Sequence, residues 1–110
     1  MNVIVAGKDP AGIGDALADT ATVSRIDVAN RPALEDAGIL DAAVYVLTEV
    51  EQATSISVAK DLNPDVKAVV YAEGSLPEFV KGQVDLAVDP GLLDAATVAE
   101  ELSNDARDAL

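Results

Sequence analysis

The stretch Asn2-Val3-Ile4-Val5-Ala6-Gly7-Lys8-Asp9-Pro10-Ala11-Gly12-Ile13-Gly14 decides the fold. Its apolar, β-branched start, residues 3–6, predicts a strand that is buried on both faces. A turn with several glycines ends that strand, and an alanine-rich segment with helical character follows. A strand that leads through a glycine turn to a helix N-terminus is typical of doubly wound α/β domains.

Strand-like and helix-like segments alternate through the rest of the chain. Strands are predicted at residues 3–6, 23–28, 42–47, 66–72 and 84–88, with a helical segment after each. Short connections between alternating elements indicate a parallel sheet with right-handed crossovers. We therefore expect an α/β fold, a three-layer Rossmann-like domain whose five-stranded parallel sheet has the order 2-1-3-4-5 and helices on both faces. This single domain should span residues 1–102, and residues 103–110 should form a polar C-terminal tail.

Polar residues stand where helix caps are expected. Asn30 precedes a helical segment that Gly38 ends. Thr48 and Ser75 are each followed three residues later by a glutamate, which is the spacing of a capping box. Asp94 precedes the last helix and is predicted to cap it.

The charge of the chain limits its partners. Its 110 residues include 20 acidic and 7 basic residues, a formal charge of −13. Such a surface repels nucleic acids and anionic membranes, and it repels itself unless salt screens the charges. Together with few aromatics and a small-residue apolar content, this composition resembles that of proteins from salt-loving archaea. We expect a halophilic archaeal protein without a nucleic-acid partner.

The absence of cysteine and histidine removes several kinds of chemistry. It excludes disulfides, zinc–thiolate sites, cysteine nucleophiles and Ser-His-Asp triads. No other base or nucleophile stands out, so the sequence favours a non-catalytic protein without a metal site. The first residues lack the features of a signal peptide, and no apolar run reaches bilayer length. A cytoplasmic protein without membrane insertion is expected.

Three runs carry a resemblance to a known family: residues 33–48 (ALEDAGILDAAVYVLT), 58–66 (VAKDLNPDV) and 84–90 (VDLAVDP). They resemble the TrkA-type N-terminal domain, also called the RCK or KTN domain, in the shortened form of small haloarchaeal proteins. The resemblance implies a dimeric Rossmann-like domain that binds NAD(H) or an adenine nucleotide and regulates potassium transport. The predicted function is a non-catalytic, nucleotide-binding regulatory domain that forms a homodimer, with a transporter or another protein as its partner.

The predicted cofactor-binding residues follow the first three strands. They are Gly7, Asp9, Gly12, Gly14, Asp27 and Thr48. The glycines would form a phosphate loop, although Asp9 takes the middle position of G-x-G-x-x-G when Gly7 is the first glycine. Asp27 lies 20 residues after Gly7, the separation expected for a carboxylate that binds a ribose hydroxyl. Thr48 either lines the adenosine pocket or caps the next helix.

Asp9 also supports an alternative function. Asp-Pro at positions 9 and 10 is a common helix start, with the aspartate as cap and the proline at the first helical position. The carboxylate would then occupy the amides that a phosphate needs, and no cofactor would bind. The chain would be a degenerate Rossmann domain that acts through dimerisation or through a protein partner.

The response-regulator receiver is another doubly wound domain of this size. Its phosphorylation site needs an acidic pair after the first strand, a phosphoacceptor aspartate after the third and a lysine after the fifth. This chain has Ala6-Gly7, Thr48-Glu49 and Asp89-Pro90 at those places. The sequence therefore argues against a receiver.

Overall fold

The computed structural model describes residues 1–108 and contains a five-stranded parallel sheet. The strands are β1 (Asn2–Ala6), β2 (Thr22–Ile26), β3 (Val44–Leu47), β4 (Lys67–Tyr71) and β5 (Leu86–Val88). They follow the order β2-β1-β3-β4-β5, and every neighbouring pair is parallel. The predicted α/β class and strand order are confirmed.

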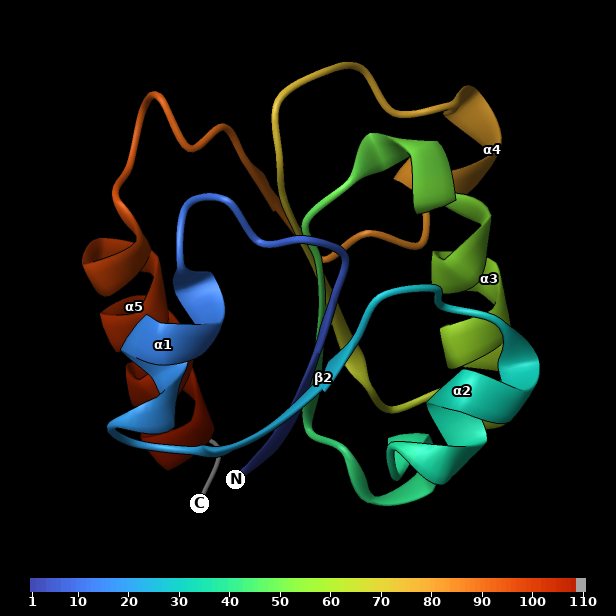
Figure 1. Ribbon diagram of the computed structural model, residues 1–110, viewed down its shortest axis with the longest axis horizontal. Helices are drawn as coiled ribbons and strands as arrows, with labels where there is room; N and C mark the ends of the chain where they lie inside the picture. Colours follow the sequence, from blue (N-terminus) through green and yellow to red (C-terminus); the bar gives the residue numbers. More distant parts are fainter. Residues whose placement is uncertain (109–110) are drawn as a thin grey trace.

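Helices cover both faces of the sheet and give the domain three layers (Figure 1). One face carries α1 (Ile13–Ala18) and α5 (Ala95–Asp108), and the other carries α2 (Arg31–Asp36), α3 (Thr54–Leu62) and α4 (Glu78–Lys81). Two short 3₁₀ turns, η1 (Ile39–Asp41) and η2 (Val50–Gln52), lie in the connections before and after β3.

The alternating side chains of the strands supply the two halves of the core. Val3, Val5 and Val46 pack toward α1 and α5 in one buried cluster. Ile4 and Tyr45, on the opposite face of the sheet, belong to the cluster that includes residues of α2 and α3. Because β1 and β3 are buried on both faces, they appear in the sequence as continuous apolar runs.

The carboxyl ends of the strands meet at one edge of the sheet. Ala6 pairs in register with Ile26 of β2 and with Leu47 of β3. The residues that follow these strands therefore lie together, at the point where the chain order of the sheet reverses between β1 and β3. Ligands of open α/β sheets bind at this point, so it is the first place to look for a site.

Two of the predicted caps are confirmed and two are wrong. The side chain of Asn30 accepts a hydrogen bond from the Ala33 amide, and that of Asp94 accepts one from the Thr97 amide. The hydroxyl of Thr48 instead donates to a carbonyl of β1. Ser75 does not cap α4, which has Pro77 at its N-cap position and no side-chain cap.

The C-terminal segment differs from the expected polar tail. Helix α5 continues through Asp108, so the boundary expected at residue 102 falls inside a helix. Ser103 is buried, and its hydroxyl lies 2.7 Å from that of Thr20. The last two residues of the expected tail, 109 and 110, lie outside the described part of the chain.

Candidate functional site

The loop after β1 is closed by a hydroxyl group from the end of β3. Thr48 donates its Oγ1 proton to the Ala6 carbonyl at 2.7 Å and accepts the Asp9 amide at 3.1 Å. Gly7 makes this approach possible because it has φ +101° and a Cβ there would collide with the Thr48 hydroxyl. Thr48 is only 6% exposed, so its hydroxyl is committed to holding β1 and β3 together.

The Asp9 carboxylate lies at the start of α1, where it accepts two backbone amides. Its two oxygens each lie 2.8 Å from an amide nitrogen, one of Ile13 and one of Gly14. The side chain of Asp9 is 5% exposed, and Arg25 of β2 reaches it at 3.4 Å. The amides that could bind a phosphate at this helix N-terminus are therefore already bonded within the chain.

The form of this contact differs from the predicted helix start. The N-cap position of α1 belongs to Gly12, which has φ +77° and makes no side-chain bond. Pro10 is therefore not the first helical residue, and Asp9 reaches the amides from within the loop, with φ +52° of its own. The predicted Asp-Pro cap is wrong in position, although the Asp9 carboxylate does occupy the helix amides.

The guanidinium of Arg25 lies close over Gly14. A Cβ on Gly14 would lie 2.5 Å from Arg25 Nη1, so a larger residue there would push the flexible guanidinium aside. Arg25 Nη2 also lies 2.6 Å from the exposed carboxylate of Asp15. Arg25 thus joins β2 to the α1 N-terminus through two aspartates.

Gln52 of η2 joins the loop after β2 to the loop after β3. Its Nε2 donates to the Asp27 carbonyl and to Glu49 Oε2, both at 2.8 Å, and its Oε1 accepts the Ala29 amide. Hydrogen bonds from Gln52 and from the Lys8 amide lower the pKa of Glu49. Asp27 itself is exposed and contributes its backbone carbonyl to this network.

A hollow of about 460 Å³ opens beside this network at the same edge of the sheet. It is lined by Pro10, Ala11, Thr48, Glu49, Val50, Glu51, Tyr71, Ala72, Glu73 and Pro90. Three of these residues are glutamates and none is a lysine or arginine, so the hollow repels a phosphate group.

The structure brings together five of the six predicted site residues. Gly7, Asp9, Gly12, Gly14 and Thr48 form the closed loop between β1 and α1, and Asp27 stands apart from it on the far side of Gln52. Sequence reasoning missed Arg25, Glu49 and Gln52. A lone arginine on the exposed face of an edge strand was the one available signal; nothing in the sequence singles out Gln52.

Residues 1–108 show neither a metal-binding cluster nor a membrane-spanning helix. This part of the chain holds no group of three or more acidic, histidine or cysteine side chains that could bind a metal ion. Within the same residues, no helix has the length and apolar content needed to cross a membrane.

Comparison with known proteins assigns the family. Residues 3–102 match the profile of DUF7126, described as a family of unknown function. The chain belongs to DUF7126. No curated protein matches it.

Solved structures with a similar fold come from regulatory and pilus assembly proteins. A putative pilus assembly-related protein from Burkholderia pseudomallei has a TM-score of 0.68 at 14% identity, over 94% of this chain and 87% of that one. The RcsB response regulator of Salmonella typhimurium has a TM-score of 0.67 at 20% identity, over 99% of this chain and 60% of RcsB. A B. pseudomallei response regulator, solved with a phosphorylated aspartic acid, a calcium ion and citrate, has a TM-score of 0.57 at 17% identity, over 94% of this chain and 71% of that one.

These findings overturn the predicted family and function. The DUF7126 match and the response-regulator neighbours replace the TrkA-type (RCK) domain, and the predicted function, a nucleotide-binding TrkA-type regulator, is wrong. The physical reason is visible at the loop, where Asp9 occupies the helix amides and three glutamates line the hollow. The cofactor itself, NAD(H) or an adenine nucleotide, stays a prediction. The sequence argument against a receiver rested on its missing phosphorylation residues, and the chain nevertheless shares the fold of these response regulators.

Proposed function

We propose that this DUF7126 protein is a receiver-like regulatory domain that takes no phosphoryl group and acts through contact with another protein. The similarity in fold to response regulators supports the regulatory class. The residues at the strand ends support the loss of phosphorylation, since Ala6-Gly7 replaces the acidic pair and Asp89-Pro90 replaces the lysine. A cytoplasmic location belongs to the same proposal.

One observation carries this proposal. Thr48 stands directly after β3, where a receiver has its phosphoacceptor aspartate, and its buried hydroxyl is bonded on both sides within the chain. A phosphoryl group on that oxygen would break the bond to the Ala6 carbonyl and would bring negative charge beside Glu49. Because the phosphoacceptor aspartate and the lysine are both replaced, phosphorylation does not switch this domain. The domain therefore acts through its contacts with another protein.

Exposure to a small phosphodonor tests the proposal. The protein is incubated with acetyl phosphate and Mg²⁺ in KCl and then weighed intact by mass spectrometry, beside a receiver domain that has the complete acidic site. The expected result is no added phosphoryl group on this protein and a clear addition on the receiver.

The Thr48→Ala variant serves as the matched control. If the wild-type protein gains a phosphoryl group that Thr48→Ala does not, Thr48 is an acceptor and the proposal is wrong. A phosphoryl group that both proteins gain would place the acceptor elsewhere, and this too would overturn the loss of phosphorylation.

A further inference from the structure

The hollow at the carboxyl edge of the sheet has a mostly apolar lining. Its volume of about 460 Å³ lies within the range of pockets that hold small ligands. The lining residues with largely apolar side chains are Pro10, Ala11, Val50, Tyr71, Ala72 and Pro90, and the rest are Thr48 and the glutamates Glu49, Glu51 and Glu73. We call this site the edge hollow.

Two loops that touch form one wall of the edge hollow. Val50 and Glu51 belong to η2, after β3, and Ala72 and Glu73 follow β4. A Cβ on Gly74 would lie 3.0 Å from Val50 Cγ2, so the loop after β4 packs directly against η2. Glu51 and Glu73 are the chain neighbours of these two touching residues, and they bring two carboxylates to the same hollow.

The other polar groups of the edge hollow are bonded within the chain. The Tyr71 hydroxyl donates to the Leu93 carbonyl at 2.7 Å. The oxygens of Glu49 accept the Lys8 amide at 3.1 Å and Gln52 Nε2 at 2.8 Å. Both of these donors are neutral amides, so they leave the negative charge of Glu49 uncompensated.

Glu51 and Glu73 carry free negative charge beside the apolar lining. Both residues are exposed. Within the described part of the chain, the ion pairs engage other carboxylates, and neither Glu51 nor Glu73 takes part in one. The charge of Lys8 acts on Glu49, but these two side chains form no ion pair in residues 1–108 either. A concave surface with charges of one sign concentrates their field and attracts the opposite sign.

An apolar lining with unpaired carboxylates matches a long cationic side chain. Lysine and arginine bury their aliphatic stems against apolar surface and keep the charged end in water. Charge complementarity also favours a basic partner for a chain of charge −13.

We propose that the edge hollow receives an arginine or lysine side chain from a basic segment of a partner protein. The stem of that side chain contacts the apolar lining, and its charged end pairs with Glu51 and Glu73. The inference rests on the proposed function, because it names the kind of protein that the domain contacts.

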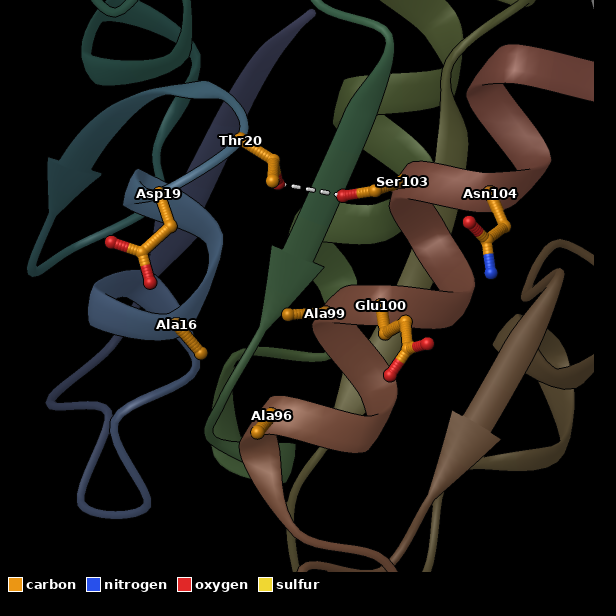
Figure 2. Close-up of a pocket in the computed structure, with 8 residues that line it drawn as sticks. All are labelled: Ala16, Asp19, Thr20, Ala96, Ala99, Glu100, Ser103 and Asn104. Carbon is orange, nitrogen blue, oxygen red and sulfur yellow. Dashed lines mark hydrogen bonds between the residues drawn. The ribbon is translucent and has the colours of Figure 1, made fainter.

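The groove between α1 and α5 provides the contrast (Figure 2). Its volume of about 240 Å³ is roughly half that of the edge hollow, and its apolar lining consists of Ala16, Ala96 and Ala99. Its acidic residues are Asp19 and Glu100. Alanines offer a long stem little surface, so this groove tests whether carboxylates alone are enough.

Fluorescence anisotropy with a labelled peptide tests the proposal. The probe is a short acetylated and amidated peptide in which arginine alternates with glycine. In the control peptide citrulline replaces arginine, which keeps the shape and removes the charge. The full chain is titrated at the lowest KCl concentration at which circular dichroism shows the folded domain. Saturable binding of the arginine peptide is expected, at least about tenfold tighter than that of the citrulline peptide, and added KCl should weaken it.

A matched pair of double variants separates the edge hollow from net charge. Glu51→Gln with Glu73→Gln changes the charge from −13 to −11 and should raise the dissociation constant at least about fivefold. Glu35→Gln with Glu100→Gln makes the same change at exposed glutamates of α2 and of the α1–α5 groove. This second pair should change the dissociation constant by less than about twofold.

A second pair of variants tests the apolar part of the edge hollow at constant charge. Ala11→Phe narrows the hollow at an exposed lining residue and should weaken binding at least about fivefold. Ala18→Phe makes the same change at an exposed alanine of α1 outside the hollow, and binding should remain as in the wild type. Circular dichroism checks that all four variants are folded.

Three results would overturn the proposal. One is a wild-type protein that binds the arginine peptide no better than the citrulline peptide. Another is equal weakening by the two glutamate pairs, which would show attraction by net charge alone. The third is unchanged binding in Ala11→Phe, which would place the peptide outside the edge hollow. Absence of peptide binding together with absence of phosphorylation would end this inference and leave the proposed function standing, whereas a gained phosphoryl group would overturn the proposed function itself.

Discussion

At the scale of single residues, the loop after β1 shows how a chain can occupy its own anion site. The Asp9 carboxylate bonds the amides of Ile13 and Gly14 at the start of α1, and the guanidinium of Arg25 lies beside it. A negative group is favoured at a helix N-terminus because the amides there lack partners within the helix. Here the chain supplies that group itself, so the loop is a structural joint between β1, β2 and α1.

Substitutions of Asp9 should separate the role of the carboxylate from that of the backbone. Asp9→Ala leaves two amides without an acceptor and puts alanine, which tolerates the left-handed conformation less well than aspartate, at φ +52°, so it should cost about 3 kcal/mol of unfolding free energy. Asp9→Asn should cost less, since asparagine keeps one acceptor oxygen and tolerates the left-handed conformation. Urea unfolding measures both variants.

Asp15→Asn is the control for this series. Asp15 also bonds Arg25, but its side chain is 89% exposed, and exposed ion pairs contribute little. Asp15→Asn should lower the free energy of unfolding by less than about 0.5 kcal/mol. If Asp9→Ala were no worse than Asp15→Asn, the Asp9 carboxylate would have no structural role.

Tyr45 gives the protein a dependence on alkaline pH. Its hydroxyl lies 2.7 Å from that of Ser55, and burial raises the pKa of Tyr45 from 10.0 to about 12, although the Ser55 bond lowers it. The unfolded chain therefore loses this proton first, and the free energy of unfolding should fall as pH rises from 10 toward 12. The loss should reach roughly 3 kcal/mol, at 1.36 kcal/mol per unit of pKa.

The Tyr45→Phe variant isolates this effect. It lacks the ionisable group, so the difference in unfolding free energy between wild type and variant should stay constant below pH 10 and shift in favour of the variant above it. If the free energy of unfolding fell equally in the wild type and in Tyr45→Phe up to pH 12, groups other than Tyr45 would cause the alkaline destabilisation.

At the scale of elements, Tyr71 ties the end of β4 to the loop that carries the exposed leucines. Its hydroxyl donates to the Leu93 carbonyl at 2.7 Å. Tyr71→Phe should cost about 1 kcal/mol and should open this loop locally. Faster hydrogen exchange is expected at the Leu92 and Leu93 amides, both bonded to the Asp89 carbonyl.

Exchange at a distant helix gives the reference for Tyr71→Phe. Exchange of the amides within α3 should become faster only to the extent that the variant lowers the global free energy of unfolding. A uniform change over Leu92, Leu93 and α3 would mean that the hydroxyl stabilises the whole domain and does not hold this loop.

The elements themselves were largely predictable, and the caps show where prediction stops. Alternating apolar runs and turns led to the correct strand order, because parallel strands with short crossovers allow few arrangements. Asn30 and Asp94 were correct caps because each side chain bonds an amide three residues ahead. Thr48 has the same spacing to a glutamate, yet its hydroxyl bonds back to β1. Local spacing cannot show which of two partners, a helix amide or a distant strand carbonyl, lies nearer.

At the scale of the whole molecule, the family assignment failed for a related reason. The runs that suggested a TrkA-type domain include a helix–strand segment, residues 33–48, and a strand with its flanks, residues 84–90. Doubly wound domains of many functions share such segments. The residues that decide function lie at the strand ends. Their contacts leave no periodic pattern in the sequence. Gln52, for example, bonds Asp27, which is 25 residues away, and also Glu49, which is 3 residues away.

The acidity of the whole chain leads to a last prediction, on salt. A folded domain of charge −13 repels itself, so the thermal midpoint should rise with KCl, most steeply below about 1 M, where the screening length reaches about 3 Å. Replacing the exposed residues Asp36, Asp41 and Asp65 by asparagine changes the charge from −13 to −10 and should reduce this rise. Sucrose stabilises folded proteins without screening charge, so both proteins should respond to it equally. If the triple variant responded to KCl as the wild type does, exclusion of salt from the surface, and not charge screening, would set the salt dependence.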